Sequence, residues 1–555
     1  MATKKRDSSL PDYALVERQE MLRGVGYDDE AIERPQIGVV SSWGEINPAS
    51  IHLDRVTESV KAGIWSAGGT PREFVISSIC TSMAGNDRYH LPHRDLVAGY
   101  IETVAETNLF DGLLCVPICD DVIPAHLMAA ARLNLPAVFV TGGYMQLNRH
   151  KGDVLEPLDV APVHYAEFKA GKIHSSEFNH IKDRGCMGTG ACPIMGTANT
   201  MAAMAEALGM TFPGNTTVPG ADSQLMRYAF RAGQQAVHLQ RSNIRPTDIM
   251  TLAAFRNAIR LLMAIGGSTN AVLHLQAIAA EMDLAIEPQI FNELSRATPF
   301  ICDVIPSGPG ANHLGILDEA GGIQAVMKEL EPLLDTGALT VTGASLVDNL
   351  KDIAHGDRSV IRSLEDPLDR EGGLIFLQGN LAPGGGLIKK SAMPDEMMKH
   401  RGPARIFATE EQACDALNEN KISAGEVVIV RYVGPKGDPG MRLLQRFLWQ
   451  VAARGMQDKI AFITDGRFSG TNKGCAVAHI APEAADGGPL AVVRDGDMIE
   501  IDIPNQKLRV DISDAELRSR MDDWTPPESS IKKGWLSIYA KMAKAADQGA
   551  ALRYD

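Results

Sequence analysis

The feature that most constrains the fold of this chain is the alternation of short, β-branched apolar runs with longer amphipathic segments. In the first two-thirds of the sequence, runs at residues 36–41, 73–77 and 136–141 alternate with helix-like segments at residues 53–67 and 125–133. The runs are too continuously apolar for one face to meet water, so strands within them are expected to be buried on both faces. This pattern predicts an α/β architecture with a mostly parallel sheet.

The pattern of the sequence changes at about Gly372. From there on, turns rich in glycine, proline and aspartate separate short apolar runs, which is typical of a β-rich, barrel-like domain. The runs lie at residues 374–377, 426–431, 459–464, 490–493 and 498–503. A chain of 555 residues also exceeds what one hydrophobic core usually supports. We therefore expect one domain over residues 1–365 and a second over residues 366–555.

Charge and hydropathy exclude several classes of partner. The formal net charge of -15 argues against nucleic acid and against anionic membranes, since both require clustered lysine and arginine. The N-terminal residues 1–9 are positively charged, but no apolar segment of a signal peptide follows them. The most apolar long stretch, residues 261–280, contains too many polar residues for a lipid-spanning helix. We expect a cytoplasmic protein that acts on a small molecule.

Three cysteines occupy positions that suggest a metal site. Cys186 and Cys192 are six residues apart on a glycine-bearing turn, and Cys119 ends an apolar run just before Asp120 and Asp121. Such thiols can hold a soft metal or an iron–sulfur cluster, and in a reducing compartment eight cysteines stay free rather than forming a disulfide scaffold. The alternative is structural: buried thiols behave as small hydrophobes, and aspartates often cap a following helix.

Five sequence blocks carry a resemblance to a known family. The blocks span residues 185–201, 266–275, 379–385, 434–441 and 464–470. They include Cys186-Met-Gly-Thr-Gly-Ala-Cys192, Gly434-Pro-Lys-Gly-Asp-Pro-Gly-Met441 and Thr464-Asp-Gly-Arg-Phe-Ser-Gly470. In order and rough spacing they are similar to the dihydroxy-acid dehydratase family, which also includes phosphogluconate and sugar-acid dehydratases. The resemblance spans nearly the whole chain.

The resemblance implies an N-terminal α/β/α domain, a C-terminal swivelling β-barrel like that of aconitase, and a homodimer or homotetramer. It also implies removal of water from a 2,3-dihydroxy acid to give a 2-keto acid. In the family an iron–sulfur cluster takes the departing C3 hydroxyl, and Mg²⁺ binds the carboxylate and the C2 hydroxyl. The family's serine base corresponds to Ser469. Arg467 and Thr471, beside this serine, are further candidates for binding and orienting the substrate.

The cluster ligands follow from matching motifs. Cys119 and Cys192 match two family cysteines, whereas the position of the usual third holds Ala49. Cys186 is the natural substitute thiol, and Cys80 is a further candidate. Whether the cluster is of the two-iron or the four-iron type stays open.

The Mg²⁺ ligands are largely replaced. Asp120 matches the family's aspartate. Asp121 occupies the position of the family's metal-binding lysine, and Leu443 occupies the position of its metal-binding glutamate. The family's other aspartate falls in residues 77–83, which contain no carboxylate. One interpretation retains Mg²⁺ between Asp120 and Asp121.

The other interpretation replaces the metal by a positively charged side chain that holds the substrate carboxylate directly. Arg442 lies beside the lost glutamate, and Arg88 and His90 lie near the lost aspartate.

Two functions are therefore carried forward. The first is a hydro-lyase that uses a cluster on Cys119, Cys192 and Cys186. The second is a dehydratase-fold protein without the metal site, which either performs metal-free chemistry on a related hydroxy acid or serves as a binding or regulatory protein. The intact turn at residues 466–470 and the paired thiols favour the first, whereas the missing carboxylates favour the second.

Overall fold

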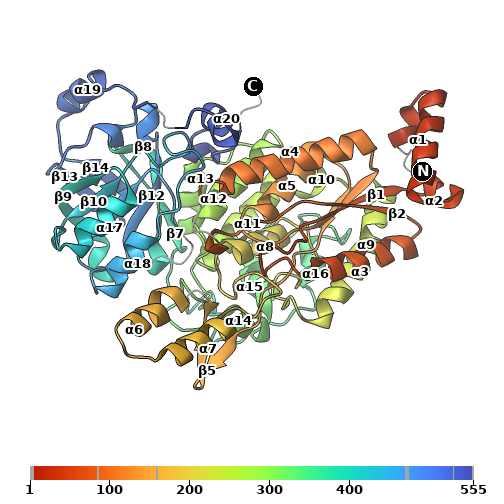
Figure 1. Cartoon of the computed structure of the whole chain (residues 1–555), viewed down its shortest axis with the longest axis horizontal. Helices are drawn as coiled ribbons and strands as arrows, with labels where there is room; N and C mark the ends of the chain where they lie inside the picture. Colours follow the sequence, from red (N-terminus) through yellow and green to blue (C-terminus); the bar gives the residue numbers. More distant parts are fainter. Residues whose placement is uncertain (1–5, 84–86, 158–159, 469–473, 529–530, 553–555) are drawn as a thin grey trace.

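The computed structural model describes residues 6–83, 87–157, 160–468, 474–528 and 531–552. It consists of an α/β part followed by a closed β-barrel. Figure 1 shows the barrel, in cyan and blue, at one end of the molecule, beside the helices and the sheet of the α/β part. The predicted fold class, an α/β chain with a mostly parallel sheet and a C-terminal barrel, is confirmed.

A parallel sheet forms the centre of the α/β part. Its strands are β1 (Gln36–Ser41), β2 (Thr70–Val75), β3 (Gly112–Val116) and β4 (Ala137–Phe139), in the order β2-β1-β3-β4. All residues of β1, β3 and β4 are buried, which is why these segments read as unbroken apolar runs. The run expected at residues 73–77 corresponds to β2, which begins earlier and ends at Val75.

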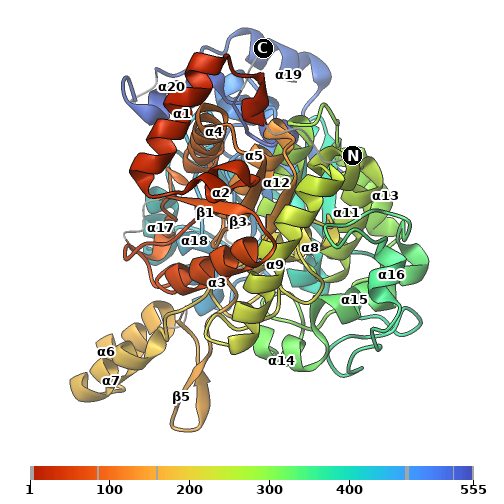
Figure 2. The same ribbon diagram turned by 90° about the vertical axis from the view of Figure 1, so that its right-hand side faces the viewer.

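Helices cover both faces of this sheet. Figure 2 shows α4 (His90–Asn108) and α5 (Val122–Leu133) on one side, and α3 (Leu53–Ser66) and α9 (Ser223–Ser242) on the other. Helices α3 and α9 cross closely at Gly63 and Gly233. A Cβ atom at Gly63 would lie 2.0 Å from the carbonyl oxygen of Phe230, so the crossing requires glycine.

Further helices pack around this core. Helix α8 (Thr197–Ala207) is buried along its entire length and begins just after the glycine-bearing turn that holds Cys192. It packs against α11 (Leu252–Ala264) and α12 (Asn270–Ala280). The other helices of this part include α13 (Pro288–Arg296), α14 (Leu314–Glu319), α15 (Gly322–Leu330) and α16 (Leu346–Leu350).

The barrel closes in the strand order β10-β11-β12-β8-β7-β14-β13-β9. Its strands are β7 (Leu374–Gly379), β8 (Ala382–Lys389), β9 (Lys399–Phe407), β10 (Val427–Val430), β11 (Ala461–Thr464), β12 (Cys475–Ala481), β13 (Met498–Asp502) and β14 (Lys507–Val510). One predicted strand is wrong. Residues 490–493 fall largely in a 3-10 helix, Pro489–Val492, because the proline at its first position fixes φ and lacks the N–H that a strand ladder needs.

An arm projects from the α/β part. Figure 2 shows strand β5 (Asn148–His150) and helices α6 (Tyr165–Lys169) and α7 (Ser175–Gly185) extending away from the body. Its small core includes the stacked rings of Phe168 and Phe178, whose centroids are 5.0 Å apart. The arm returns to the body at Cys186, directly after α7.

The C-terminal segment connects the barrel back to the α/β part. Arg94, on α4, is fully buried, pairs with Asp95 and donates to the carbonyl oxygens of Gly549 and Ala550. Tyr539, on α20 (Trp535–Met542), packs in the same buried cluster as Leu91. No helix in the described ranges combines the length and the apolar character needed to span a bilayer.

Candidate active site

A pocket of about 350 Å³ lies at the carboxyl ends of three neighbouring strands. Its walls include Ala49 after β1, Cys80 after β2 and Cys119 after β3. Loops at the carboxyl ends of parallel strands are where ligands bind in open α/β sheets. Leu443 and Trp449, from the barrel half of the sequence, complete the wall. The pocket therefore lies where the two parts of the molecule meet.

Four cysteines line this one pocket: Cys80, Cys119, Cys186 and Cys192. The other cysteines, Cys115, Cys302, Cys414 and Cys475, are buried in hydrophobic clusters, as expected for structural thiols. The structure thus brings together the three thiols that the sequence predicted and Cys80, the further candidate. Cys119 has a φ of 71°, an unusual value for a residue with a side chain, so backbone strain is located at this site.

Burial raises the pKa values of three of the pocket thiols, Cys80, Cys119 and Cys192. Burial raises the pKa of Cys192 to about 12, and the nearby charges of Cys80 and Asp120 act in the same direction. Burial also raises the pKa values of Cys119 and Cys80, with Asp120 adding to both shifts. A bound cation would reverse these effects, because thiolates bind metals and their ligation releases protons.

Asp120 and Asp121 have different surroundings. Asp120 lines the pocket, and burial followed by the charge of Asp121 raises its pKa. Asp121 is only 2% exposed and contacts Nδ1 of His90, with its Oδ1 3.9 Å from Nε2 of His274. Burial alone would raise the pKa of Asp121, but the charge and hydrogen bond of His90 outweigh it and hold that pKa below its usual value.

His90 completes this buried pair. Burial favours its neutral form, but the charge and hydrogen bond of Asp121 prevail and raise the pKa of His90. The ring lines the pocket, and its Nε2 has no hydrogen-bond partner among the described residues. Sequence reasoning placed His90 near a lost carboxylate but missed its pairing with Asp121.

The donor set fits an iron–sulfur cluster, because several thiols from separate loops line one cavity. The donor set does not fit Mg²⁺. Of the described residues that line the pocket, Asp120 alone carries a carboxylate, whereas Mg²⁺ requires an octahedral set of oxygen ligands. Within the described part of the chain, no three His, Cys, Asp or Glu side chains converge on a point suited to a single metal ion.

Arg442 pairs with three carboxylates. Its Nε lies 3.0 Å from Oδ1 of Asp87, its Nη1 lies 3.5 Å from Oδ2 of Asp438, and its Nη2 lies 3.8 Å from Oε1 of Glu411. Arg88 also pairs with Asp438, at 3.0 Å between Nε and Oδ1. Sequence reasoning singled out both arginines but missed these aspartates, one of which, Asp87, stands directly beside Arg88 in the sequence.

Arg467 is almost fully buried beside the pocket. Its Nε donates to the carbonyl oxygen of Met441 at 2.8 Å, while its Nη2 has no hydrogen-bond partner among the described residues. Its positive charge lowers the pKa values of Asp120 and Asp121. Arg467 therefore offers an unused donor close to the pocket's acidic groups.

Ser469 and Thr471 lie outside the described residues. The preceding residue, Phe468, accepts a hydrogen bond through its carbonyl oxygen from Nδ2 of Asn270 at 3.4 Å, and Asn270 lines the pocket. Phe468, the last described residue before Ser469, thus contacts the pocket wall.

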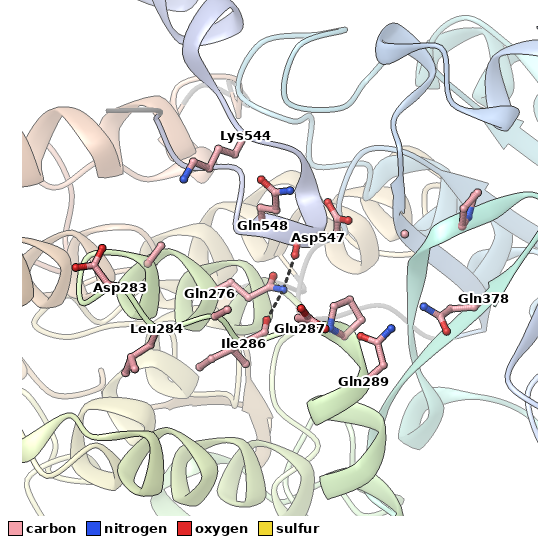
Figure 3. Close-up of a pocket in the computed structure, with 15 residues that line it drawn as sticks. Gln276, Asp283, Leu284, Ile286, Glu287, Gln289, Gln378, Lys544, Asp547 and Gln548 are labelled. Atoms are coloured by element: carbon pink, nitrogen blue, oxygen red, sulfur yellow. Dashed lines mark hydrogen bonds between the residues drawn. The ribbon is translucent and has the colours of Figure 1, made fainter. Parts of the chain in front are cut away.

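A larger cavity, of about 580 Å³, lies elsewhere, between α12, α13, β8 and the C-terminal segment. Figure 3 shows Gln276 at its centre, donating to the carbonyl oxygens of Asp547 (2.8 Å) and Ile286 (3.0 Å). Lys544 lies at its edge. None of its described lining residues is a thiol or a predicted site residue, so the cysteine-lined pocket is the candidate active site.

Two family profiles match most of the chain. Residues 34–349 match the profile described as dihydroxy-acid/6-phosphogluconate dehydratase N-terminal, and residues 359–550 match the corresponding C-terminal profile. The dihydroxy-acid dehydratase of Acetivibrio thermocellus is 45% identical over 558 residues, covering 99% of both chains. That of Halothermothrix orenii is 44% identical over 539 residues, covering 96% of this chain and 97% of the relative. That of Moorella thermoacetica is 44% identical over 553 residues, covering 99% and 100%.

Proposed function

The chain belongs to the dihydroxy-acid/6-phosphogluconate dehydratase family, and we propose that it is a hydro-lyase that converts a 2,3-dihydroxy acid or sugar acid into a 2-keto acid. The observation that carries this proposal is the pocket itself. It gathers Cys119 and Cys192 with Asp120 at the carboxyl edge of the sheet, where the barrel half closes over them. A reaction that expels hydroxide needs an electrophile in a site shielded from bulk water, and this location provides that shielding.

Cys119 and Cys192 would hold an iron–sulfur cluster together with a third thiol, for which Cys186 is the candidate from the sequence. When bound, the cluster would supply a Lewis-acidic iron for the departing hydroxyl. No role is assigned to Mg²⁺, because Asp121 is already engaged by His90.

Unpaired polar groups in the wall of the pocket and buried beside it suit a hydroxylated acid. Nη2 of Arg467 and Nε2 of His90 face no described partner, and neither does Oδ1 of Asn270. The guanidinium and a protonated imidazole can donate to a carboxylate or hydroxyl, while the amide oxygen can accept from a hydroxyl. Arg442 is a second candidate for the carboxylate, but it would have to exchange Asp87 for the substrate.

Ser469 is proposed as the base that removes the C2 proton, with Thr471 orienting the substrate. Loss of the C2 proton and the C3 hydroxyl yields an enol, which tautomerises to the 2-keto acid. The support for these roles is the family motif and the position of Phe468 beside Asn270 at the pocket wall.

The second candidate is a family member that binds a hydroxy acid without dehydrating it. The loss of pocket carboxylates favours this reading, since Asp120 alone remains among the described lining residues. A panel of 2,3-dihydroxy acids and sugar acids separates the two. Formation of a 2-keto acid supports the hydro-lyase, whereas calorimetric binding without product supports the binding protein.

The domain boundary, the oligomeric state and the cellular location expected from the sequence are also proposed. The domain boundary is placed between residues 365 and 366, shortly before β7 begins at Leu374. The protein is proposed to be a homodimer or homotetramer, which light scattering would test. A cytoplasmic location would keep the pocket thiols reduced.

A further inference from the structure

We propose that Cys80 is a ligand of the iron–sulfur cluster and takes the place left by Ala49, so that Cys80, Cys119 and Cys192 form the ligand set. This inference rests on the proposed function, because it assumes that the pocket holds a cluster. It assigns to Cys80 a role that the family motifs do not contain.

The first support is the arrangement of the strands. Strand β1 lies between β2 and β3, so the loops that follow these three strands emerge side by side at one edge of the sheet. Ala49 lies on the loop after β1, Cys80 on the loop after β2 and Cys119 on the loop after β3. A thiol lost from the central loop can therefore be replaced by one from the adjacent loop.

The second support is a direct link between the loops of Ala49 and Cys80. Oδ1 of Asn47 accepts from the backbone N–H of Ala49 at 2.9 Å. Nδ2 of the same residue donates to the carbonyl oxygen of Ser78 at 3.0 Å and to its hydroxyl at 2.7 Å. Asn47 and Ser78 are both buried, so this bridge fixes the loop of Cys80 against position 49.

The loop of Ala49 is also fixed to the glycine-bearing turn that holds Cys192. The backbone N–H of Thr189 donates to the carbonyl oxygen of Pro48 at 3.0 Å, and that of Gly190 donates to Ala49 at 3.3 Å. Three of the loops that carry or adjoin the pocket thiols are thus hydrogen-bonded into one unit around position 49.

Cys186 is more exposed than Cys80. It directly follows helix α7 of the projecting arm, whereas Cys80 is half-buried and its loop is held by Asn47. We assign Cys186 to the mouth of the pocket and not to the ligand set. A cluster held by three thiols would keep a coordination position for the substrate hydroxyl, as the proposed reaction requires.

The test compares metal content between variants of the full chain purified anaerobically. Wild type, Cys80→Ala, Cys186→Ala and the control Cys414→Ala are assayed for iron, acid-labile sulfide and visible absorption. Cys414 is buried in a cluster of the barrel half, away from the pocket. We expect wild type, Cys186→Ala and Cys414→Ala to carry equal iron, and Cys80→Ala to lose most of its iron and its visible absorption.

A rescue variant distinguishes the loss of a cluster ligand from misfolding. Ala49→Cys added to Cys80→Ala restores a thiol at the neighbouring position, and we expect it to recover iron and colour. Circular dichroism confirms folding in each case. Full iron in Cys80→Ala, or loss of iron in Cys186→Ala alone, overturns this inference and leaves the proposed function intact. An iron-free wild type overturns both.

Discussion

The carboxylate of Asp121 contacts Nδ1 of His90 beneath the cysteine-lined pocket, where both side chains are shielded from solvent. The sequence resemblance assigns a metal-binding lysine to the position of Asp121, so a negative charge lies where a metal-binding group was expected. His90, at the start of α4, supplies the compensating positive charge. The pair accounts for the absence of Asp121 from the pocket wall and explains why Mg²⁺ has too few ligands there.

Breaking this pair should destabilise the fold. Asp121→Asn leaves His90 buried without its counter-charge, and removing one partner of a buried pair typically costs about 3–5 kcal/mol of unfolding free energy. Denaturant unfolding of Asp121→Asn, His90→Gln and the double variant measures the coupling. If the two single losses simply add, the contact contributes nothing to stability.

The stabilisation from His90 should depend on pH. The pKa of His90 is raised above its ordinary 6.5 in the folded state, so protonated His90 stabilises the fold below that value. This contribution is lost as pH rises through the folded pKa. The difference in unfolding free energy between wild type and His90→Gln should therefore shrink as the pH rises above 6.5. A difference that stays constant as the pH rises would contradict the raised pKa.

Arg442 should act mainly as a structural ion-pair partner. Arg442→Met removes its pairs with Asp87 and Asp438 and should lower the unfolding free energy by about 1–3 kcal/mol. The exposed Arg446 provides a matched control, since Arg446→Met should change stability little. A large rise in KM for Arg442→Met with unchanged stability would instead identify Arg442 as the group that binds the substrate carboxylate.

Arg467 should contribute directly to substrate binding. Arg467→Lys keeps the charge but loses the planar arrangement in which Nε binds Met441 while Nη2 stays available. Losing one charged hydrogen bond should lower kcat/KM about 10- to 100-fold. Arg431→Lys is the control, because this barrel arginine donates to the carbonyl oxygens of Leu490 and Val493. Equal kcat/KM for wild type and Arg467→Lys would remove Arg467 from the binding site.

Strands such as β1 and β4 could be predicted because burial on both faces leaves an unbroken apolar run. The strand predicted at residues 490–493 is wrong for the same reason, since a buried 3-10 helix is equally apolar. Only Pro489 distinguishes this 3-10 helix from a strand in the sequence.

The candidate site was predictable only where a motif marks it. Cys119 and Cys192 follow from local sequence. The position of Cys80 depends on the sheet order and on the bridge through Asn47, which no local pattern encodes. Similarly, His90 and Asp121 are far apart in sequence and meet only because α4 packs against α5.

The most direct test of the proposed function is 2-keto acid formation by anaerobically purified, iron-loaded protein supplied with 2,3-dihydroxy acids, with Cys192→Ser prepared in the same way. The account predicts that wild type forms one 2-keto acid for each dihydroxy acid consumed and that Cys192→Ser forms none. An iron-loaded wild type that binds these acids without forming any 2-keto acid would contradict it.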